Sequence, residues 1–167
     1  METQSLVIRR ATLKDLPSVT EIYNDAILTT TVTFDTQPKT SQEQIAWFEK
    51  HKEKFPIMVA EDGQKILGWA SLSPWSDRCA YADTAENSVY VDKNARGRGI
   101  GRSLLKEIVS EGQRLGLHTI IARIAGESEA SVRLHESVGF SKIGTMKEVG
   151  RKFGHLLDVH LYQLIFR

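Results

Sequence analysis

Apolar residues recur along the chain with two kinds of spacing: helical spacing predicts helices, and short alternating or continuous runs predict strands. Residues 6–10 are predicted to form a strand, after which Thr12 and Asp15 have the spacing of a capping box that begins a helix. The apolar side chains from position 13 to position 27 then share one helical face. The β-branched residues 29–34 end this helix, and residues 41–44 can cap a second helix that carries Trp47 and Phe48.

The second half of the chain alternates strands with helices. Residues 55–61 and 65–72 are predicted strands on either side of Asp62-Gly63, a hairpin signal. A strand over 87–91 precedes an amphipathic helix over 100–115, which Gly116 ends. Residues 118–125 are apolar without interruption, as expected for a buried parallel strand, and a short helix over 129–138 follows. Residues 140–149 and 156–166 are predicted to form a terminal antiparallel pair.

This order of elements predicts an α/β fold with a mixed central sheet and helices on both faces. The strand–helix–strand unit over 87–125 is expected to be parallel and right-handed. The sequence has 167 residues and shows no repeat or linker, so we expect one domain over residues 1–167.

Composition narrows the range of partners. Lys and Arg number 22 against 21 Asp and Glu, so the formal charge of +1 gives no field that would attract nucleic acid or an anionic membrane surface. Cys79 is the single cysteine, which excludes an intramolecular disulfide framework and favours a reducing compartment. No secretory signal or membrane-spanning stretch is visible, so we expect a cytoplasmic location. The histidines form no recognisable metal spacing, and we expect no metal.

The segment Arg96-Gly97-Arg98-Gly99-Ile100-Gly101 lies between a predicted strand and a predicted helix. Its glycines bare backbone N–H groups at a helix N-terminus, where the helix dipole and nearby arginines, including Arg102, favour an anion such as a pyrophosphate. The spacing is neither the dinucleotide fingerprint G-x-G-x-x-G nor the Walker pattern.

What remains, R-x-x-G-x-G after Val89-Tyr90-Val91, resembles the coenzyme A pyrophosphate loop of the GCN5-related N-acetyltransferase (GNAT) superfamily. The helix that ends before Gly139-Phe140 sits where that superfamily has its last core helix. Other segments are similar to one branch, the phosphinothricin and methionine-sulfoximine acetyltransferases, and the resemblance covers nearly the whole chain. These segments include Ile8-Arg9-Arg10-Ala11-Thr12, Thr31-Val32-Thr33-Phe34, Pro74-Trp75 and, near the end, Asp158-Val159.

The resemblance implies a GNAT fold in which two parallel strands splay apart and hold the pantetheine arm of acetyl-CoA, the co-substrate. Ser128 stands where many members have asparagine, and its hydroxyl could bond to the pantetheine arm instead. The residues expected to contact coenzyme are Ser88, Val89, Tyr90, Val91, Arg96, Gly97, Arg98, Gly99, Ile100, Gly101, Arg102, Glu127, Ser128 and Ser131.

Acetyl transfer to an amine needs a base, an oxyanion stabiliser and a proton for the departing thiolate. The resemblance assigns catalysis to Glu86 and to His135, which replaces a tyrosine found in many members; a surface carboxylate and a packed histidine are the plainer alternatives. A backbone N–H of the 89–91 strand could stabilise the oxyanion. Arg78, or an arginine near it, could clamp an acceptor carboxylate. The expected acceptor-binding residues are Thr31, Phe34, Trp75, Ser76, Asp77, Arg78, Ala85, Glu86 and Asn87.

The sequence therefore predicts an N-acetyltransferase acting on the α-amino group of a small amino acid or analogue, of the methionine sulfoximine, methionine sulfone or phosphinothricin type, which it would detoxify. One alternative is a protein N-terminal or lysine acetyltransferase, and another is a non-catalytic acetyl-CoA sensor. The branch resemblance also implies a homodimer.

Overall fold

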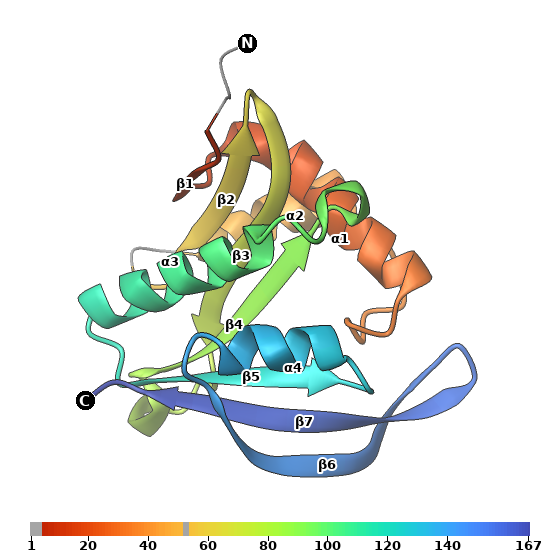
Figure 1. The fold of residues 1–167 in the computed structure, drawn as a ribbon, viewed down its shortest axis with the longest axis vertical. Coiled ribbons are helices and arrows are strands. Elements are labelled where there is room, and N and C mark those ends of the chain that lie inside the picture. The colour runs from red at the N-terminus through yellow and green to blue at the C-terminus, as the bar shows by residue number, and fades with distance from the viewer. Residues whose placement is uncertain (1–4, 52–53) are drawn as a thin grey trace.

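The computed structural model describes residues 5–51 and 54–167 (Figure 1). These residues form a seven-stranded sheet in the order β1-β2-β3-β4-β5-β7-β6. The neighbouring strands are antiparallel except β4 and β5, which run parallel. The predicted α/β fold with a mixed sheet is therefore confirmed. The strands are β1 (Val7–Arg10), β2 (Ile57–Asp62), β3 (Lys65–Pro74), β4 (Thr84–Val91), β5 (Thr119–Ala125), β6 (Ser141–Lys152) and β7 (His155–Ile165).

Helices cover both faces of the sheet. On one face α1 (Leu16–Thr29) packs on β3 and β4 and carries α2 (Ser41–Lys50), with Val19 and Trp69 in the small core beneath. On the other face α3 (Ile100–Arg114) packs across β2, β3 and β4, and α4 (Glu129–Glu136) packs on β5. The larger core lies under α3, where Leu104 and Ile108 are fully buried. Alternation along β4 sends Val89 to the α3 side and Tyr90 to the α1 side.

The sheet opens between its two parallel strands. In the described chain β4 and β5 pair only at Thr84 with Thr119, Ala85 with Ile120 and Glu86 with Ile121. Beyond these pairs β4 continues to Val91 and β5 to Ala125 along diverging paths (Figure 1). The expected splay is thus present, and the backbone edge of β4 from residue 87 onward is free of β5.

Several predicted boundaries were wrong by a few residues. Thr40 caps α2, one residue before the predicted start, because its Oγ1 accepts from Glu43 N at 3.2 Å while its own N–H donates to the Glu43 carboxylate at 2.8 Å. The hairpin turns on Gly63 and Gln64, both with positive φ, rather than on Asp62-Gly63. β4 begins at Thr84 and not at 87, so Glu86 lies inside the strand instead of before it.

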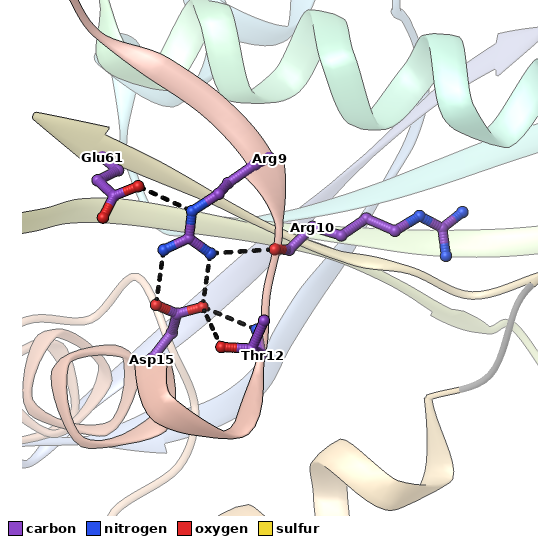
Figure 2. A network of polar contacts seen from close by, with 5 residues as sticks. All are labelled: Arg9, Arg10, Thr12, Asp15 and Glu61. Carbon is purple, nitrogen blue, oxygen red and sulfur yellow. Dashed lines mark hydrogen bonds and ion pairs between the residues drawn. The ribbon is translucent and has the colours of Figure 1, made fainter. Parts of the chain in front are cut away.

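A charged network fixes the N-terminal strand to the first helix (Figure 2). Arg9 on β1 donates to both carboxylate oxygens of Asp15, at 2.8 and 2.9 Å, and to Glu61 on β2 at 2.8 Å. Asp15 also accepts from the backbone N–H of Thr12 at 2.7 Å, which realises the predicted capping box as a short 3₁₀ turn before α1. The guanidinium of Arg9 lowers the pKa of Asp15. The network therefore holds β1, β2 and α1 in one arrangement.

Candidate active site

A cavity of about 910 Å³ runs across the sheet at the point where β4 and β5 part. Its walls come from β4 beyond Glu86, the glycine turn over 96–102, the first turns of α4, the segment after α1, and the β6–β7 hairpin. It therefore meets residues of the α1 side, such as Tyr23, and residues of the α3 side, such as Ile100. One ligand can enter from each face of the sheet and meet the other between the strands.

The glycine turn forms one end of this cavity. Gly97 and Gly99 both have a φ of 77°, and a Cβ added to either would meet nothing within 4 Å in the described structure. Gly99 is the N-cap of α3, which has no side-chain cap hydrogen bond among the described residues, so the first amides of the helix are available to an anion. Arg96 and Arg102 line the cavity beside them. This end of the cavity is therefore suited to an anion such as a phosphate.

Two predicted residues of the turn differ from their neighbours. Arg98 lies outside the cavity lining and pairs instead with Asp62 of β2, with Nη2 and Oδ2 3.0 Å apart. Gly101 lines the cavity in ordinary helical conformation, and a Cβ there would lie 3.5 Å from Leu134 and 3.6 Å from Val91, which is normal contact. The backbone conformation favours glycine at 97 and 99 and does not favour it at 101.

Glu86 is tied to an arginine that sequence reasoning missed. Arg123 lies two residues beyond Ile121, the partner of Glu86, and so points to the same side of the sheet. Its Nε donates to Glu86 Oε1 at 2.6 Å and its Nη2 donates to Oε2, which raises the pKa of Arg123. Both side chains line the cavity, with Glu86 22% and Arg123 49% exposed. An ion pair that water reaches contributes only about 0–1 kcal/mol, so a ligand can open it.

The ring of Trp75 packs against the guanidinium group of Arg123. The guanidinium carbon of Arg123 lies 5.3 Å from the centre of the Trp75 ring, a cation–π distance. Trp75 itself stands outside the cavity lining, as do the predicted acceptor residues Ser76, Asp77 and Arg78 on the loop that follows it. Ala85 is fully buried in the core. Within the described chain the predicted loop therefore reaches the cavity only through the contact of Trp75 with Arg123.

His135 is held in one protonation state by two neighbours. Its Nδ1 lies 2.8 Å from the backbone carbonyl of Ser131, and because a carbonyl can only accept, Nδ1 carries the proton. Its Nε2 accepts from Asn87 Nδ2 at 3.0 Å. The side chain is 5% exposed, and burial lowers the pKa of His135, which keeps the ring neutral. In this arrangement Nε2 carries no proton, so it has to receive one before it can donate it.

Asn87 brings a further polar atom to the cavity wall. Its Oδ1 is buried and has no hydrogen-bond partner among the residues that the structure describes. Asn87 also lines the cavity, beside the part of β4 that β5 does not pair. A buried acceptor without a donor at such a wall marks a place where a ligand can supply the missing N–H.

The segment after α1 closes the cavity on the α1 side of the sheet. The Tyr23 hydroxyl bonds to Thr33 Oγ1 at 3.1 Å and donates to the Asp35 carboxylate, and burial raises the pKa of Tyr23. Lys152, on the β6–β7 hairpin and 4% exposed, donates to the Thr33 carbonyl at 2.8 Å. Phe34 lies against Gly150 of the same hairpin and lines the cavity. Contacts between distant parts of the chain thus fix this wall.

The remaining predicted residues fall into two groups. Ser88, Val89, Tyr90, Val91, Ser128 and Ser131 line the cavity, and burial raises the pKa of the Tyr90 hydroxyl to about 12. Glu127 and Thr31 lie outside the described lining, although Thr31 Oγ1 is close to Gly126 at the start of the α4 loop.

Residues that the sequence did not reveal include Tyr23, Asp35 and Arg123. Arg123 alone carried a signal, because it is the one charged residue in the apolar run over 119–125. The described residues contain no group of three or more His, Cys, Asp and Glu side chains placed to hold a metal ion. Among the same residues, no helix has both the length and the apolar character needed to cross a bilayer.

Comparison with known proteins gives relatives of nearly equal length. A phosphinothricin N-acetyltransferase of Streptomyces coelicolor is 41% identical over 165 residues, covering 96% of each chain. An L-methionine sulfoximine/L-methionine sulfone acetyltransferase of Salmonella typhimurium is 36% identical over 160 residues, covering 95% of this chain and 94% of the relative.

Solved structures agree with this fold. A phosphinothricin acetyltransferase from Sinorhizobium meliloti in complex with AcCoA has a TM-score of 0.93 and 35% identity, covering 96% of this chain and 88% of that one. A ribosomal-protein-alanine N-acetyltransferase from Brucella melitensis has a TM-score of 0.93 and 40% identity, covering 96% and 99%. The family model of the acetyltransferase (GNAT) domain matches residues 8–161. The chain therefore belongs to the GNAT family of acetyltransferases.

Proposed function

We propose that this enzyme moves an acetyl group from acetyl-CoA to the α-amino group of a small amino acid or analogue, of the phosphinothricin, methionine sulfoximine or methionine sulfone type, and so detoxifies it. The observation that carries the proposal is the cavity that joins the phosphate cradle at Gly97 and Gly99 to the charged pair at Glu86. The relatives named for these acceptors support it. We also infer that residues 1–167 act as one N-acetyltransferase domain.

The residues present fit acetyl-CoA. The turn at Gly97 and Gly99, together with Arg96 and Arg102, suits a diphosphate. The edge of β4 beyond Glu86 is not paired with β5 and offers backbone groups to an amide-containing arm, to which Asn87 Oδ1 adds an acceptor. These groups would hold the co-substrate so that its thioester lies near Glu86.

In the reaction the amine nitrogen forms a bond to the thioester carbon, and the bond from that carbon to sulfur breaks. The amine loses protons, and the departing thiolate gains one. Glu86 at the cavity wall is suited to accept the proton, directly or through water, while Arg123 keeps its carboxylate in place. His135 is the predicted proton donor, and in that role Nε2 would first have to receive a proton in place of its bond from Asn87.

A protein or peptide acetyltransferase is the second candidate, favoured by the name of the Brucella melitensis structure. The wall formed by Phe34 and the β6–β7 hairpin narrows the acceptor side of the cavity and supports a small acceptor instead. A non-catalytic acetyl-CoA sensor is the third reading, and a sensor has no need of the Glu86 side chain.

A thiol-release assay with acetyl-CoA as donor tests the proposal. We expect release with methionine sulfoximine, methionine sulfone or phosphinothricin, and little with short peptides or free lysine side chains. Glu86→Gln should lower kcat by about 10²–10⁴-fold while acetyl-CoA still binds, which separates an enzyme from a sensor. Glu129→Gln, an exposed carboxylate on α4, is the matched control. Turnover of peptides alone would overturn the proposal.

We further propose that the enzyme is a cytoplasmic homodimer. Four large apolar side chains on β6, β7 and the turn between them are 44% to 56% exposed, namely Ile143, Phe153, Leu156 and Ile165. A second copy of the chain could cover this surface. Cys79 is exposed as a free thiol, in keeping with a reducing compartment. Sedimentation of the purified protein should give twice the monomer mass, and Ile143→Glu should reduce it.

A further inference from the structure

We propose that Glu86 and Arg123 form a recognition site for zwitterionic amino acids, in which Arg123 binds the carboxylate of the acceptor and Glu86 binds its ammonium group. The inference rests on the proposed function, because it names the residues that select the acceptor. It adds a specificity-determining residue, Arg123, to the acceptor site.

Position is the first argument. The pair bridges β4 and β5 where the strands part, because Glu86 is in the last paired position and Arg123 lies two residues beyond its partner Ile121. Both side chains line the cavity and project to the face that α1 and α2 cover, while the glycine turn begins α3 on the opposite face. An acceptor that enters from the α1 side therefore meets these two charges before it reaches a thioester held from the α3 side.

Charge is the second argument. An α-amino acid carries an ammonium and a carboxylate on one carbon atom, and the cavity presents a carboxylate and a guanidinium side by side. When the zwitterion binds, each of the four charges keeps a partner of opposite sign. An amine that lacks a neighbouring carboxylate would instead place its positive charge next to Arg123, with the Glu86 carboxylate alone to offset two positive charges. The ion pair thus selects free amino acids over peptide N-termini and lysine side chains.

Geometry is the third argument. A guanidinium has five N–H donors, and Glu86 uses two of them, so three remain. Trp75 holds the guanidinium from one side at 5.3 Å, and the Arg123 side chain is 49% exposed, so the unused donors are open to a ligand. Arg123 can therefore bind a carboxylate while it still contacts Glu86, and the acceptor need not break the pair before it binds.

The test compares methionine sulfone with its carboxamide, which keeps the amine and the side chain but lacks the negative charge. Wild-type enzyme should prefer the acid by at least roughly tenfold in kcat/KM. Arg123→Gln should raise the KM for the acid by about tenfold or more and should not raise the KM for the amide, so that the preference disappears. Arg133→Gln, an exposed arginine on α4 that pairs with Glu129, should behave as wild type.

The possible outcomes separate the two proposals. If wild-type enzyme acetylates neither compound, the proposed function fails. If it acetylates both equally well, or if Arg123→Gln reduces both equally while calorimetry still detects acetyl-CoA binding, the function stands and the role of Arg123 is refuted. The wild-type comparison needs no variant, so equal use of the acid and the amide refutes the role of Arg123 even if Arg123→Gln does not fold.

Discussion

Asn87 Nδ2 lies 3.0 Å from His135 Nε2, so a residue of β4 fixes the protonation of the histidine on α4. Because Nδ1 donates to the Ser131 carbonyl, both nitrogens of the ring are engaged. The neutral state of the imidazole therefore depends on both β4 and α4, and substitutions of Asn87 should change the protonation of His135.

Asn87→Asp should raise the pKa of His135. A carboxylate in place of the amide accepts from a protonated Nε2 and stabilises the imidazolium, whereas the amide N–H stabilises the neutral ring. Nitrogen chemical shifts of the imidazole, followed across pH, measure this directly, and a pH–rate limb that belongs to His135 should move to higher pH with them. Asn94→Asp adds the same charge at an exposed position and should not shift the titration. An unchanged His135 titration in Asn87→Asp would contradict the assignment.

His135→Gln should make the protein less sensitive to acid. Burial lowers the pKa of His135 in the folded state, so the unfolded chain binds a proton more readily. Above about pH 6.5 neither state is protonated, and the group contributes nothing. As pH falls below that value, the unfolded state gains the proton first and the folded state loses stability. Urea unfolding at a series of pH values should show a smaller acid loss in the variant. Burial also lowers the pKa of His51, but His51 is present in both proteins. The difference in acid sensitivity between the two proteins therefore reports His135 alone.

Gly99→Ala should weaken acetyl-CoA binding beyond its effect on stability. The positive φ of 77° costs an alanine roughly 1–2 kcal/mol of folding free energy. Gly116→Ala, with a φ of 84° and equally open space in the described structure, carries the same strain at the far end of α3, outside the cavity lining. Both variants should lose similar stability in chemical denaturation, but only Gly99→Ala should raise the Kd measured by calorimetry. Equal Kd values for the two variants would place the diphosphate elsewhere.

Gly150→Ala should impair acceptor use. A Cβ at this position would overlap the Phe34 ring, which must then leave its place in the cavity wall. We expect kcat/KM for methionine sulfone to fall several-fold, with a stability loss of about 1–3 kcal/mol and no change in the KM for acetyl-CoA. Gly144→Ala lies on the same strand, where a Cβ meets nothing within 4 Å in the described structure, and it should act as wild type. Similar kinetics in both variants would show that Phe34 does not shape the pocket.

The glycine turn of the candidate site could be predicted because its signal is local. Gly97, Gly99 and the N-terminus of α3 are consecutive in sequence, and the physical reason for glycine there acts within a single turn. The strands and helices were predicted for the same reason, since the apolar rhythm depends on neighbours along the chain.

The side-chain contacts around Glu86 and Thr33 could not be predicted in the same way. Arg123 meets Glu86 because β5 lies beside β4, and Lys152 reaches Thr33 across 119 positions in the chain. Such contacts depend on strand order and on the path of the β6–β7 hairpin, which no short segment determines. Trp75 was predicted as a site residue from its segment, but its contact with Arg123 could be seen only in the structure.

The short contact between β4 and β5 also has a mechanical consequence. In the described chain three residue pairs join β4 to β5, all at the start of the two strands. The part of the sheet up to β4 and the part from β5 onward can therefore bend relative to each other at this junction. A molecule that hydrogen-bonds to both strands in the gap adds bonds where β4 and β5 are not paired. Its binding should therefore reduce the motion of both strands and slow deuterium uptake at the amides of residues 87–91.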